Sequence, residues 1–223
     1  TKTEQSDLNQ ALYGSHGEAP RVVIAPVSVE DCFYSIVDAF NYAEEYQVPV
    51  LLLTDQGLAT RLEVIHRPDP DKLEIKQRAT SAGIAREDYK RYEYTDTGVS
   101  PMGIPGEPTG MYVATGIEHD EYGHPGYTPE IHLGMQTKRL GKQGLSVGAF
   151  YPRVLGPFPA SRVEQFAARA KRIIVPEVNY TGQLARLIKA ETNINELESV
   201  AKCDGLPFTA EAIVDLAAQE VAA

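Results

Sequence analysis

Cysteine is scarce in this 223-residue chain, which contains only Cys32 and Cys203. The two do not form a CxxC pair, and two cysteines supply neither a disulfide framework nor the ligands of an iron–sulfur cluster. Small proteins of oxidising compartments usually carry more cysteine. The cysteine content therefore favours a reducing, cytoplasmic compartment and excludes a cluster that this chain holds alone.

Long apolar runs and an excess of positive charge are also missing. No run approaches the roughly 18–20 residues of a membrane-spanning helix, and no signal-peptide pattern opens the chain. The net charge is −10, from 21 Lys and Arg against 31 Asp and Glu. Nucleic-acid binding needs clustered Lys and Arg to neutralise phosphates. We therefore expect neither a membrane nor a nucleic acid as a partner.

Three common catalytic motifs are absent as well. The sequence contains no GxSxG, no P-loop and no GxGxxG. A serine-hydrolase elbow, an NTPase site and a Rossmann dinucleotide site therefore have no support. No catalytic residue can be assigned from such a motif.

The first sixty residues instead carry the pattern of a βαβ unit. A buried strand is expected over residues 21–26, a helix beginning after the N-cap Ser28, and a continuous apolar strand over residues 48–54. This order predicts a parallel sheet, and with it an α/β fold. The helix has an apolar stripe that we interpret as core. Its members are Val29, Phe33, Ile36, Val37, Phe40 and Ala43.

A second α/β block is predicted near the end of the chain. Strands are expected over residues 145–151, 172–178 and 197–201. A capping box of Ser161 and Glu164 predicts the start of one helix. Further helices are expected over residues 181–193 and 209–222.

Between the two blocks the periodicity fades. From residue 62 to about residue 110 the sequence is rich in turn-forming Pro, Gly and Asp. An irregular segment of this length in a folded protein is usually a functional or interface loop, otherwise a linker. A helix over residues 129–142 follows it, with Pro129 suited to the first turn.

The most charged part of the middle segment is a loop over residues 115–126. Glu118, His119, Asp120, Glu121 and His124 lie within seven residues, after a short β-prone run. Glycine and proline on both sides predict a shaped loop at the end of a strand, where ligands of α/β proteins usually bind. A solvated turn without chemistry is an equal alternative. The spacing matches no strong metal-ligand pattern, so no metal ligand is assigned.

Four stretches in the same order resemble one family, the α subunits of the 2-oxoacid:ferredoxin oxidoreductases. They are similar above all to the 2-oxoglutarate type, 2-oxoglutarate synthase. The stretches are TKTEQSDL at residues 1–8, HGEAPR at 16–21, YVATGIEHDE at 112–121 and EVNYTGQL at 177–184. The resemblance covers nearly the whole chain.

The resemblance implies oxidative decarboxylation of a 2-oxo acid, here 2-oxoglutarate, with coenzyme A to succinyl-CoA, CO2 and reduced ferredoxin. It implies thiamine diphosphate shared with a β subunit, with Mg²⁺ and a [4Fe–4S] cluster on that subunit. The expected assembly is (αβ)2, active only with the β subunit.

The resemblance also implies a substrate site. In the family, a threonine placed like Thr1 contacts the substrate carboxylate, and the Thr1 hydroxyl and the Lys2 ammonium are both able to donate to one. The loop residues His119 and Asp120 correspond to a segment that approaches the substrate pocket. The thiamine-activating glutamate, and an arginine that works with the threonine, are expected upstream of this chain.

The implied fold is a thiamine-diphosphate-binding module followed by a transketolase C-terminal-like module. Residues 1–62 would be the C-terminal part of the pyrimidine-binding module, residues 63–143 a connecting segment with the active-site loop, and residues 144–223 the last module. That module lacks its first strand, so a segment is expected to be missing near residues 142–145.

Two alternatives stay open. Within the family, the substrate could be pyruvate or a branched-chain 2-oxo acid, since a second carboxylate needs an extra cationic partner. Outside catalysis, the chain could be a scaffold subunit of the same fold that binds no thiamine.

Overall fold

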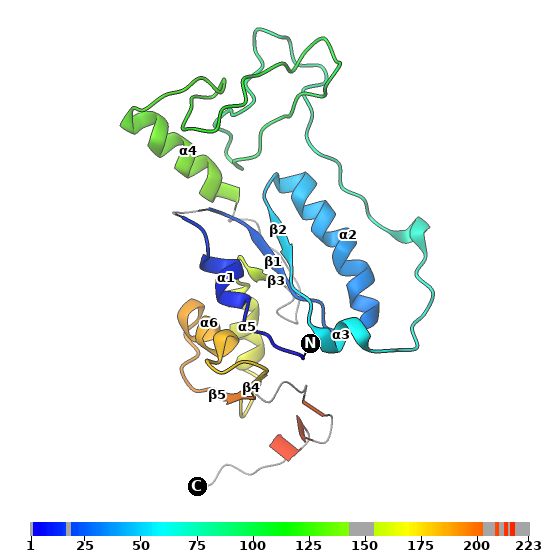
Figure 1. Ribbon diagram of the computed structural model, residues 1–223. Helices are drawn as coiled ribbons and strands as arrows, with labels where there is room; N and C mark the ends of the chain where they lie inside the picture. The colour runs from blue at the N-terminus through cyan, green and yellow to red at the C-terminus, as the bar shows by residue number, and fades with distance from the viewer. Residues whose placement is uncertain are drawn as a thin grey trace.

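The computed structural model describes residues 2–16, 19–142, 154–202, 208–209, 212–213 and 215–216. The chain order begins with α1 (Leu8–Tyr13), β1 (Val22–Ile24), α2 (Val29–Tyr46), β2 (Val50–Leu52), α3 (Gln56–Thr60) and the 3-10 helix η1 (Pro70–Lys72). It continues with α4 (Pro129–Gly141), β3 (Val154–Gly156), α5 (Ala160–Ala167), β4 (Ile174–Glu177), α6 (Gln183–Glu191) and β5 (Glu198–Ala201). Figure 1 shows this arrangement.

The predicted βαβ unit is confirmed. β1 and β2 pair in parallel, with Val22 opposite Val50, and α2 connects them. The Ser28 hydroxyl accepts a hydrogen bond of 3.0 Å from the Asp31 backbone, so the expected N-cap of α2 is confirmed too. β3 pairs antiparallel with β1 on the other side, which gives the sheet order β2-β1-β3.

The core lies on both faces of β1, because successive strand residues point to opposite faces. Val22 and Ile24 pack against α2 in a cluster with Ala39. Val23 packs on the other face with residues of α1 and α6, including Leu8 and Leu187. β1 is therefore the central layer between α2 on one side and α1 with α6 on the other.

The interpretation of the α2 stripe as core is wrong for two of its members. Ile36 is 44% exposed and Phe40 is 67% exposed, whereas Ser35 is fully buried and Ala39 is 9% exposed. The face of α2 that packs on the sheet contains Ala39 and the partly buried Tyr42, whereas Ile36 and Phe40 lie on a more exposed face. The sequence periodicity identified the helix correctly but not the face that packs on the sheet.

The second α/β block is also present. β4 and β5 pair in parallel, as the predicted strands over residues 172–178 and 197–201 require. α5 and α6 pack on them through a cluster that includes Val175, Ala185 and Ile188. α6 also contributes Leu187 to the cluster below β1, so one helix serves both cores.

The predicted capping box of Ser161 and Glu164 is wrong. Ser161 lies inside α5, whose N-cap is Pro159, and Glu164 instead accepts hydrogen bonds from the backbone and side chain of Asn193. Pattern alone misplaced this helix start by two residues, as is common at helix ends.

Other predictions fall outside the described residues. These are the strand over residues 145–151, most of the helix over residues 209–222, and the junction near residues 142–145. The division into parts at residues 62 and 143 stays a prediction.

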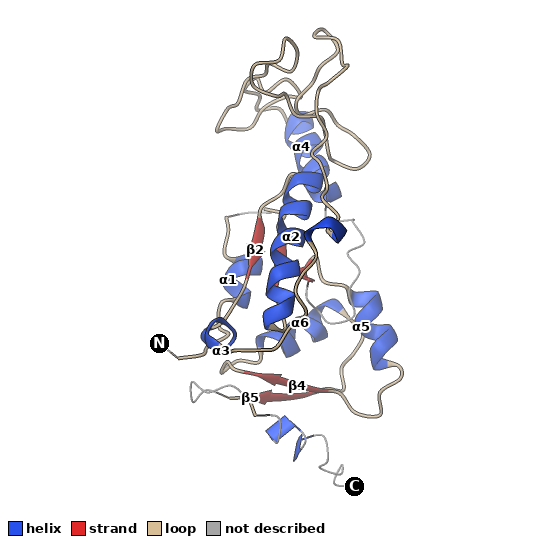
Figure 2. Ribbon diagram, turned by 90° about the vertical axis from the view of Figure 1, so that its right-hand side faces the viewer, coloured by secondary structure: helices blue, strands red, loops and turns tan. Residues whose placement is uncertain are grey.

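Residues 61–128, which we call the arm, form neither a helix longer than η1 nor a regular strand. Two isolated bridges order it, between Thr80 and Met102 and between His119 and Pro125. In Figures 1 and 2 the arm extends past the end of the sheet, and α4 leads back from it. The irregular middle segment and the helix after it are thus confirmed. Within the described part of the chain, no helix is long and apolar enough to cross a membrane.

Candidate functional site

The N-terminal segment meets both α/β units at the carboxyl ends of their strands. Gln5 donates from Nε2 to Asp55 Oδ2 at 2.9 Å, just after β2. Its Oε1 accepts from the Val178 backbone N–H at 3.3 Å, just after β4. The Gln5 backbone N–H also donates to the Val178 carbonyl at 3.0 Å. One side chain thus joins the carboxyl ends of two sheets, the edge where α/β proteins usually bind ligands.

Asp55 has a second task at this edge. Its Oδ1 accepts the Leu58 backbone N–H at 2.8 Å and so caps α3. Thr3 is 6% exposed, and its hydroxyl would lie 3.1 Å from a Cβ placed on Gly57. The small residue at position 57 therefore lets the segment that begins at Lys2 pack on the first turn of α3.

The turn after β4 is built around a buried carboxylate. Glu177 is 4% exposed, and it accepts the backbone N–H groups of Leu184 at 2.7 Å and Ala185 at 2.9 Å. Asn179 donates to it from Nδ2 at 2.8 Å and accepts from the Gly182 backbone at 2.7 Å. A carboxylate at the N-terminal end of α6 is stabilised by the helix N–H groups.

Gly182 is required in this turn. Its φ is +61°, in the left-handed region that favours glycine, and a Cβ there would lie 2.4 Å from Ser199 Oγ. The EVNYTGQL stretch is therefore a rigid cap that holds Val178 and Gln183 in place.

Gln183, at the start of α6, also binds the N-terminal segment. Its Nε2 donates to the Ser6 carbonyl at 2.9 Å, and its Oε1 accepts the Asn9 backbone N–H at 3.0 Å. Asp7, the N-cap of α1, makes no side-chain cap hydrogen bond. Gln183 of α6 thus satisfies an N–H that the first turn of α1 leaves open.

The charged loop of the arm is a tight hairpin. Asp120 N–H donates to the His124 carbonyl at 2.9 Å, and Asp120 Oδ1 accepts the N–H groups of Tyr122 and His124, both at 2.9 Å. Burial raises the pKa of Asp120, but these two backbone hydrogen bonds and the neighbouring His124 side chain together outweigh it, so the pKa of its carboxyl is lowered. Gly123 has a φ of +90°, and a Cβ there would collide with the Val113 carbonyl.

His119 packs inside this hairpin rather than away from it. Its Nδ1 lies 2.8 Å from the Asp120 carbonyl, and its ring centroid is 4.1 Å from that of Tyr92. The Arg91 guanidinium lies over the rings of Tyr92 and Tyr112. The Asp120 carbonyl and the Tyr92 ring therefore fix the orientation of the His119 ring.

Glu118 fastens the hairpin to α4. Its Oε2 lies 2.6 Å from His132 Nδ1, and its Oε1 accepts from Arg139 at 3.3 Å. The hydrogen bond from His132 lowers the pKa of the Glu118 carboxyl, and the charge of Arg139 adds to this. The acid that the sequence offered as part of a ligand cluster therefore has a structural partner on each oxygen.

A buried lysine holds the arm against α4. Lys138 is 7% exposed, and its ammonium donates to the carbonyls of Glu93 at 2.7 Å and Gly98 at 2.9 Å and to Ser100 Oγ at 2.9 Å. Burial lowers the pKa of Lys138 to about 8, and the charges of Lys142 and Arg91 act in the same direction. Three acceptors compensate a charge that would otherwise be costly to bury.

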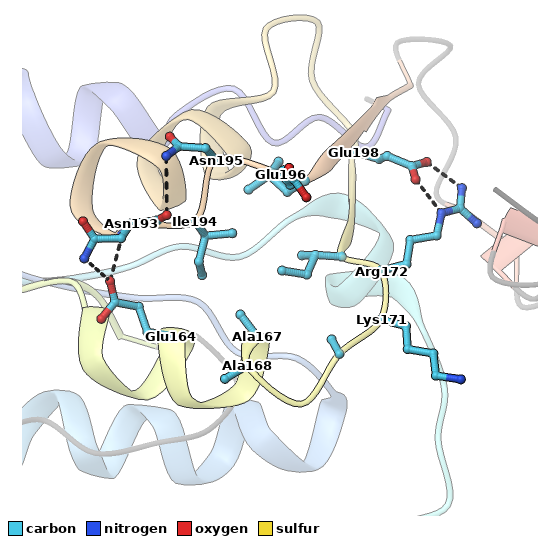
Figure 3. A pocket seen from close by; sticks show the side chains of 13 residues that line it. Glu164, Ala167, Ala168, Lys171, Arg172, Asn193, Ile194, Asn195, Glu196 and Glu198 are labelled. Atoms are coloured by element: carbon cyan, nitrogen blue, oxygen red, sulfur yellow. Dashed lines mark hydrogen bonds and ion pairs between the residues drawn. The ribbon is translucent and has the colours of Figure 1, made fainter. Parts of the chain in front are cut away.

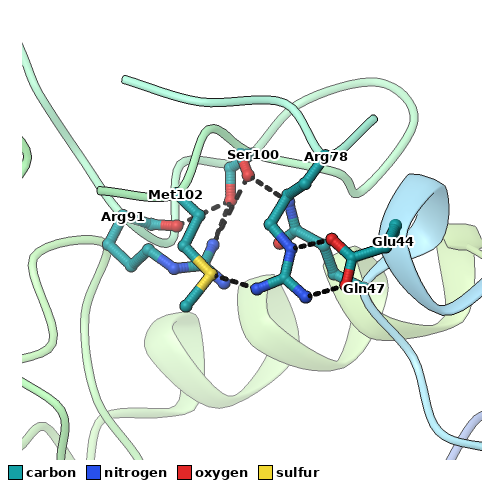
Figure 4. A network of polar contacts seen from close by, with 6 residues as sticks. All are labelled: Glu44, Gln47, Arg78, Arg91, Ser100 and Met102. Carbon is teal, nitrogen blue, oxygen red and sulfur yellow. Dashed lines mark hydrogen bonds and ion pairs between the residues drawn. The ribbon is translucent and has the colours of Figure 1, made fainter. Parts of the chain in front are cut away.

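The arm is also tied to the end of α2, as Figure 4 shows. Gln47 donates from Nε2 to the Ser100 carbonyl at 2.7 Å, and Arg78 binds Glu44. Glu44 lies in the last turns of α2 and Gln47 is its C-cap, so both precede β2. The arm thus sits at the amino end of β2, whereas Gln5 contacts its carboxyl end.

A cavity of about 950 Å³ lies in the second α/β unit. Figure 3 shows it between α5 and the segments that enter β4 and β5, with Lys171 and the Arg172–Glu198 ion pair at one side and Ile194 at the centre. It lies at the amino ends of these strands. Because sites on parallel strands form at carboxyl ends, this cavity does not belong to the edge around Gln5.

The structure places the predicted site residues in two separate regions. Thr1 lies outside the described residues, and Lys2 is exposed beside the edge that contains Gln5 and Asp55. His119 and Asp120 lie in the arm, and in Figures 1 and 2 the part of the arm that leads into α4 lies at the far end of the molecule from α3 and the N-terminus. Among the described residues of one chain, Lys2 is therefore not brought together with His119 and Asp120.

Gln5, Gln183, Glu177 and Lys138 were not predicted as site residues. Three of them lie inside the quoted stretches TKTEQSDL and EVNYTGQL, so their motifs were visible. No periodicity links two stretches that lie over 170 residues apart, and only the fold shows that they contact each other. Nothing in the sequence pattern marked Lys138 as a site residue except its place near the end of a predicted helix.

Two families match this chain. Residues 1–136 match the family described as "Pyruvate flavodoxin/ferredoxin oxidoreductase, thiamine diP-bdg". Residues 135–213 match "Pyruvate:ferredoxin oxidoreductase core domain II". The first match covers more than half of the chain. The predicted resemblance and the predicted thiamine-binding α/β fold are thereby confirmed.

Several curated proteins are similar to the chain. It is 31% identical to 2-oxoacid:ferredoxin oxidoreductase 2, subunit alpha, of Aeropyrum pernix, over 93% of this chain and 39% of that protein. It is 30% identical to the 2-oxoglutarate oxidoreductase subunit KorA of Mycobacterium tuberculosis, over 96% of this chain and 38% of that protein. The chain thus spans about two fifths of the length of these relatives.

A solved structure is similar over almost the whole chain. It is the 2-oxoglutarate:ferredoxin oxidoreductase from Magnetococcus marinus, with 2-oxoglutarate, coenzyme A and succinyl-CoA bound. The TM-score is 0.89 at 38% identity, over 97% of this chain and 45% of that one.

Proposed function

This chain belongs to the pyruvate flavodoxin/ferredoxin oxidoreductase family, and we propose that it is part of the α subunit of a 2-oxoglutarate:ferredoxin oxidoreductase. The observation that carries the proposal is the match to the Magnetococcus marinus enzyme, which extends over 97% of the chain at 38% identity. That enzyme was captured with 2-oxoglutarate, coenzyme A and succinyl-CoA, the substrates and a product of this reaction.

The proposed reaction is an oxidative decarboxylation that ends in a thioester. The bond between C1 and C2 of 2-oxoglutarate breaks, and C1 leaves as CO2. The C2 carbon loses two electrons, which reduce ferredoxin, and the coenzyme A sulfur bonds to it to give succinyl-CoA as the thiol proton is released. Thiamine diphosphate, when bound, supplies the sink for the electron pair that CO2 leaves behind.

The described residues of this chain do not by themselves form a site for the diphosphate and metal of thiamine diphosphate. Among the side chains that the structure describes, no three His, Cys, Asp or Glu residues cluster to hold a metal ion. The polar groups around Gln5 and Asp55 bind one another and are not arranged for a diphosphate. We therefore assign the diphosphate, its Mg²⁺ and a [4Fe–4S] cluster to a β subunit, in an (αβ)2 assembly that passes electrons to ferredoxin in the cytoplasm.

The substrate residues are proposed to come from two copies of the chain. Lys2 lies three residues before Gln5, at the strand edge where a ligand is expected, and the Thr1 hydroxyl and the Lys2 ammonium are groups that suit a carboxylate. His119 and Asp120 lie at the far end of the same chain, so they reach a substrate only in the site of a neighbouring copy. A rigid hairpin at the end of the arm is suited to such a reach.

The test uses the complete complex. Coenzyme-A-dependent reduction of a viologen dye is followed with 2-oxoglutarate, pyruvate and a branched-chain 2-oxo acid. Preference for 2-oxoglutarate supports the proposal. Preference for another acid moves the specificity within the family, and no reduction with any acid favours the scaffold alternative.

A further inference from the structure

We propose that Gln5 is a positioning residue that sets the place of the substrate residue Lys2 by joining the N-terminal segment to both α/β units at once. The inference rests on the proposed function, because it concerns the same substrate site. No resemblance or motif assigns this role to Gln5. It follows from the contacts at the carboxyl edges of the two sheets.

Gln5 anchors the N-terminal segment by hydrogen bonds, and the buried Thr3 packs on α3 between Gln5 and Lys2. Downstream, the chain is fixed by Gln183, which binds the Ser6 carbonyl and the Asn9 N–H, and by Leu8, which is 7% exposed in the core. Lys2 lies three residues upstream. Three extended residues span at most about 10 Å, so the position of Gln5 limits where the Lys2 ammonium can lie.

The Gln5 amide can satisfy its contacts in one orientation only. The Val178 group that it faces is a backbone N–H, so Oε1 must point there. The Nε2 group then faces Asp55 Oδ2 at 2.9 Å. A flipped amide would place a donor against a donor on one side and an acceptor against a carboxylate on the other.

Both partners of this amide are themselves fixed. Asp55 Oδ1 is held by the Leu58 N–H in the cap of α3. Val178 follows Glu177, whose carboxylate is held by two N–H groups of α6. The position of Gln5 is therefore set by both units, and Gln5 in turn limits where the segment that begins at Lys2 can lie.

The test reverses the polarity of one hydrogen bond. Gln5→Glu keeps the acceptor for Val178 but turns an oxygen toward Asp55, so two carboxylates repel. Asp55→Asn keeps the cap of α3 but turns an amide toward Gln5 Nε2, so two donors meet. In the double variant the new amide at position 55 donates to the new carboxylate at position 5, and the bond is restored with its direction reversed.

The measurements are the KM for 2-oxoglutarate, the KM for coenzyme A, kcat and the Tm of the complete complex with its β subunit. Each single variant is expected to raise the KM for 2-oxoglutarate about tenfold, the worth of one hydrogen bond to a charged group. The KM for coenzyme A is expected to stay within about twofold of wild type, because the segment that begins at Lys2 is proposed to contact the 2-oxo acid and not coenzyme A. The double variant returns the first KM to within about threefold of wild type.

Gln165→Glu is the matched control. Gln165 is exposed on α5, so the same change of amide to carboxylate there leaves both KM values unchanged.

Two results overturn the inference. The first is a KM for 2-oxoglutarate in the Gln5→Glu complex that equals that of wild type. The second is a double variant whose Tm returns to the wild-type value while its KM for 2-oxoglutarate stays raised. Failure of the proposed function looks different: the wild-type complex then reduces no dye with any 2-oxo acid, and the positioning role falls with it.

Discussion

Arg78 binds Glu44 through two parallel hydrogen bonds of 2.8 Å, from Nε to Oε2 and from the second amino group to Oε1. Arg78 belongs to the arm and Glu44 to the last turns of α2, so the pair joins an irregular segment to the folded body. Its third nitrogen faces Met102, which pairs with Thr80 across the arm. This forked contact fixes direction as well as distance.

Glu44→Gln is expected to loosen the arm. The amide keeps one acceptor for Arg78 and loses the charge and the second acceptor. Because the pair is about one-third exposed on both sides, the free energy of unfolding should fall by only about 0.5–1 kcal/mol. Urea unfolding measures it, and Glu87→Gln, an exposed change within the arm, is the control. A loss equal to that of the control would contradict the role assigned to the pair.

Lys138→Met should remove the three hydrogen bonds that Lys138 of α4 donates to the arm. Met fills most of the volume, but the carbonyls of Glu93 and Gly98 lose their donor. Leaving buried acceptors unpaired costs about 1–3 kcal/mol of unfolding free energy at neutral pH. The exposed Lys171→Met serves as the control, measured by urea unfolding and by proteolysis of the arm. An arm that resists protease as in wild type speaks against the assignment.

The same lysine makes stability depend on pH. Its pKa is lowered from 10.5 to about 8 by burial and by the cations Lys142 and Arg91. Between these values the unfolded chain binds the proton that the folded chain has released, so the free energy of unfolding rises with pH from about 8 upward. Lys142, whose pKa burial also lowers to about 8, adds to the slope. Lys138→Met should show a smaller rise over about pH 7.5–9.5, and an unchanged slope would count against the burial.

Glu177→Gln tests the cap of α6. The carboxylate accepts from Leu184, Ala185 and Asn179, and an amide would turn a donor toward these donors. The expected loss of unfolding free energy is about 2–3 kcal/mol, because the contacts are charged and buried. Differential scanning calorimetry measures it against the exposed Glu196→Gln. Equal Tm values for the two variants would show that the network is not needed.

Asp120→Asn should alter substrate preference without opening the hairpin. The asparagine oxygen still accepts the N–H groups of Tyr122 and His124, while the negative charge is removed. A dicarboxylate is repelled less, so the ratio of kcat/KM for 2-oxoglutarate to that for pyruvate is expected to rise about fivefold. Asp96→Asn, exposed elsewhere in the arm, should leave the ratio unchanged, and a fixed ratio in both variants removes Asp120 from the site.

The two-copy arrangement predicts complementation. A complex with Lys2→Ala and a complex with Asp120→Ala are each expected to be impaired. If His119 and Asp120 serve a neighbouring copy, hybrids of the two contain one site in which both residues are native, and activity returns. If they served their own chain, every hybrid site would carry one substitution, and mixing would restore nothing. Dye reduction after co-expression of the two α chains distinguishes these outcomes.

The sequence by itself determined the element types and the family. The β1–α2–β2 unit, α4, and the β4–α6–β5 unit follow from apolar periodicity, Ser28 and Pro129, because these signals are local and strong. The family followed from four short stretches in a fixed order. The charged loop was correctly placed outside regular structure by its glycines and proline.

Only the tertiary structure decided which face of each element packs and which distant residues meet. Ser35 and Ala39 are buried whereas Phe40 is 67% exposed, because the packing of α2 on the sheet, and not the apolar stripe alone, sets which face is covered. Glu118 and Lys138 are structural because α4 folds back on the arm. Gln5 joins two sheets because residues over 170 positions apart share one edge, and a local pattern carries no information about contacts at that separation.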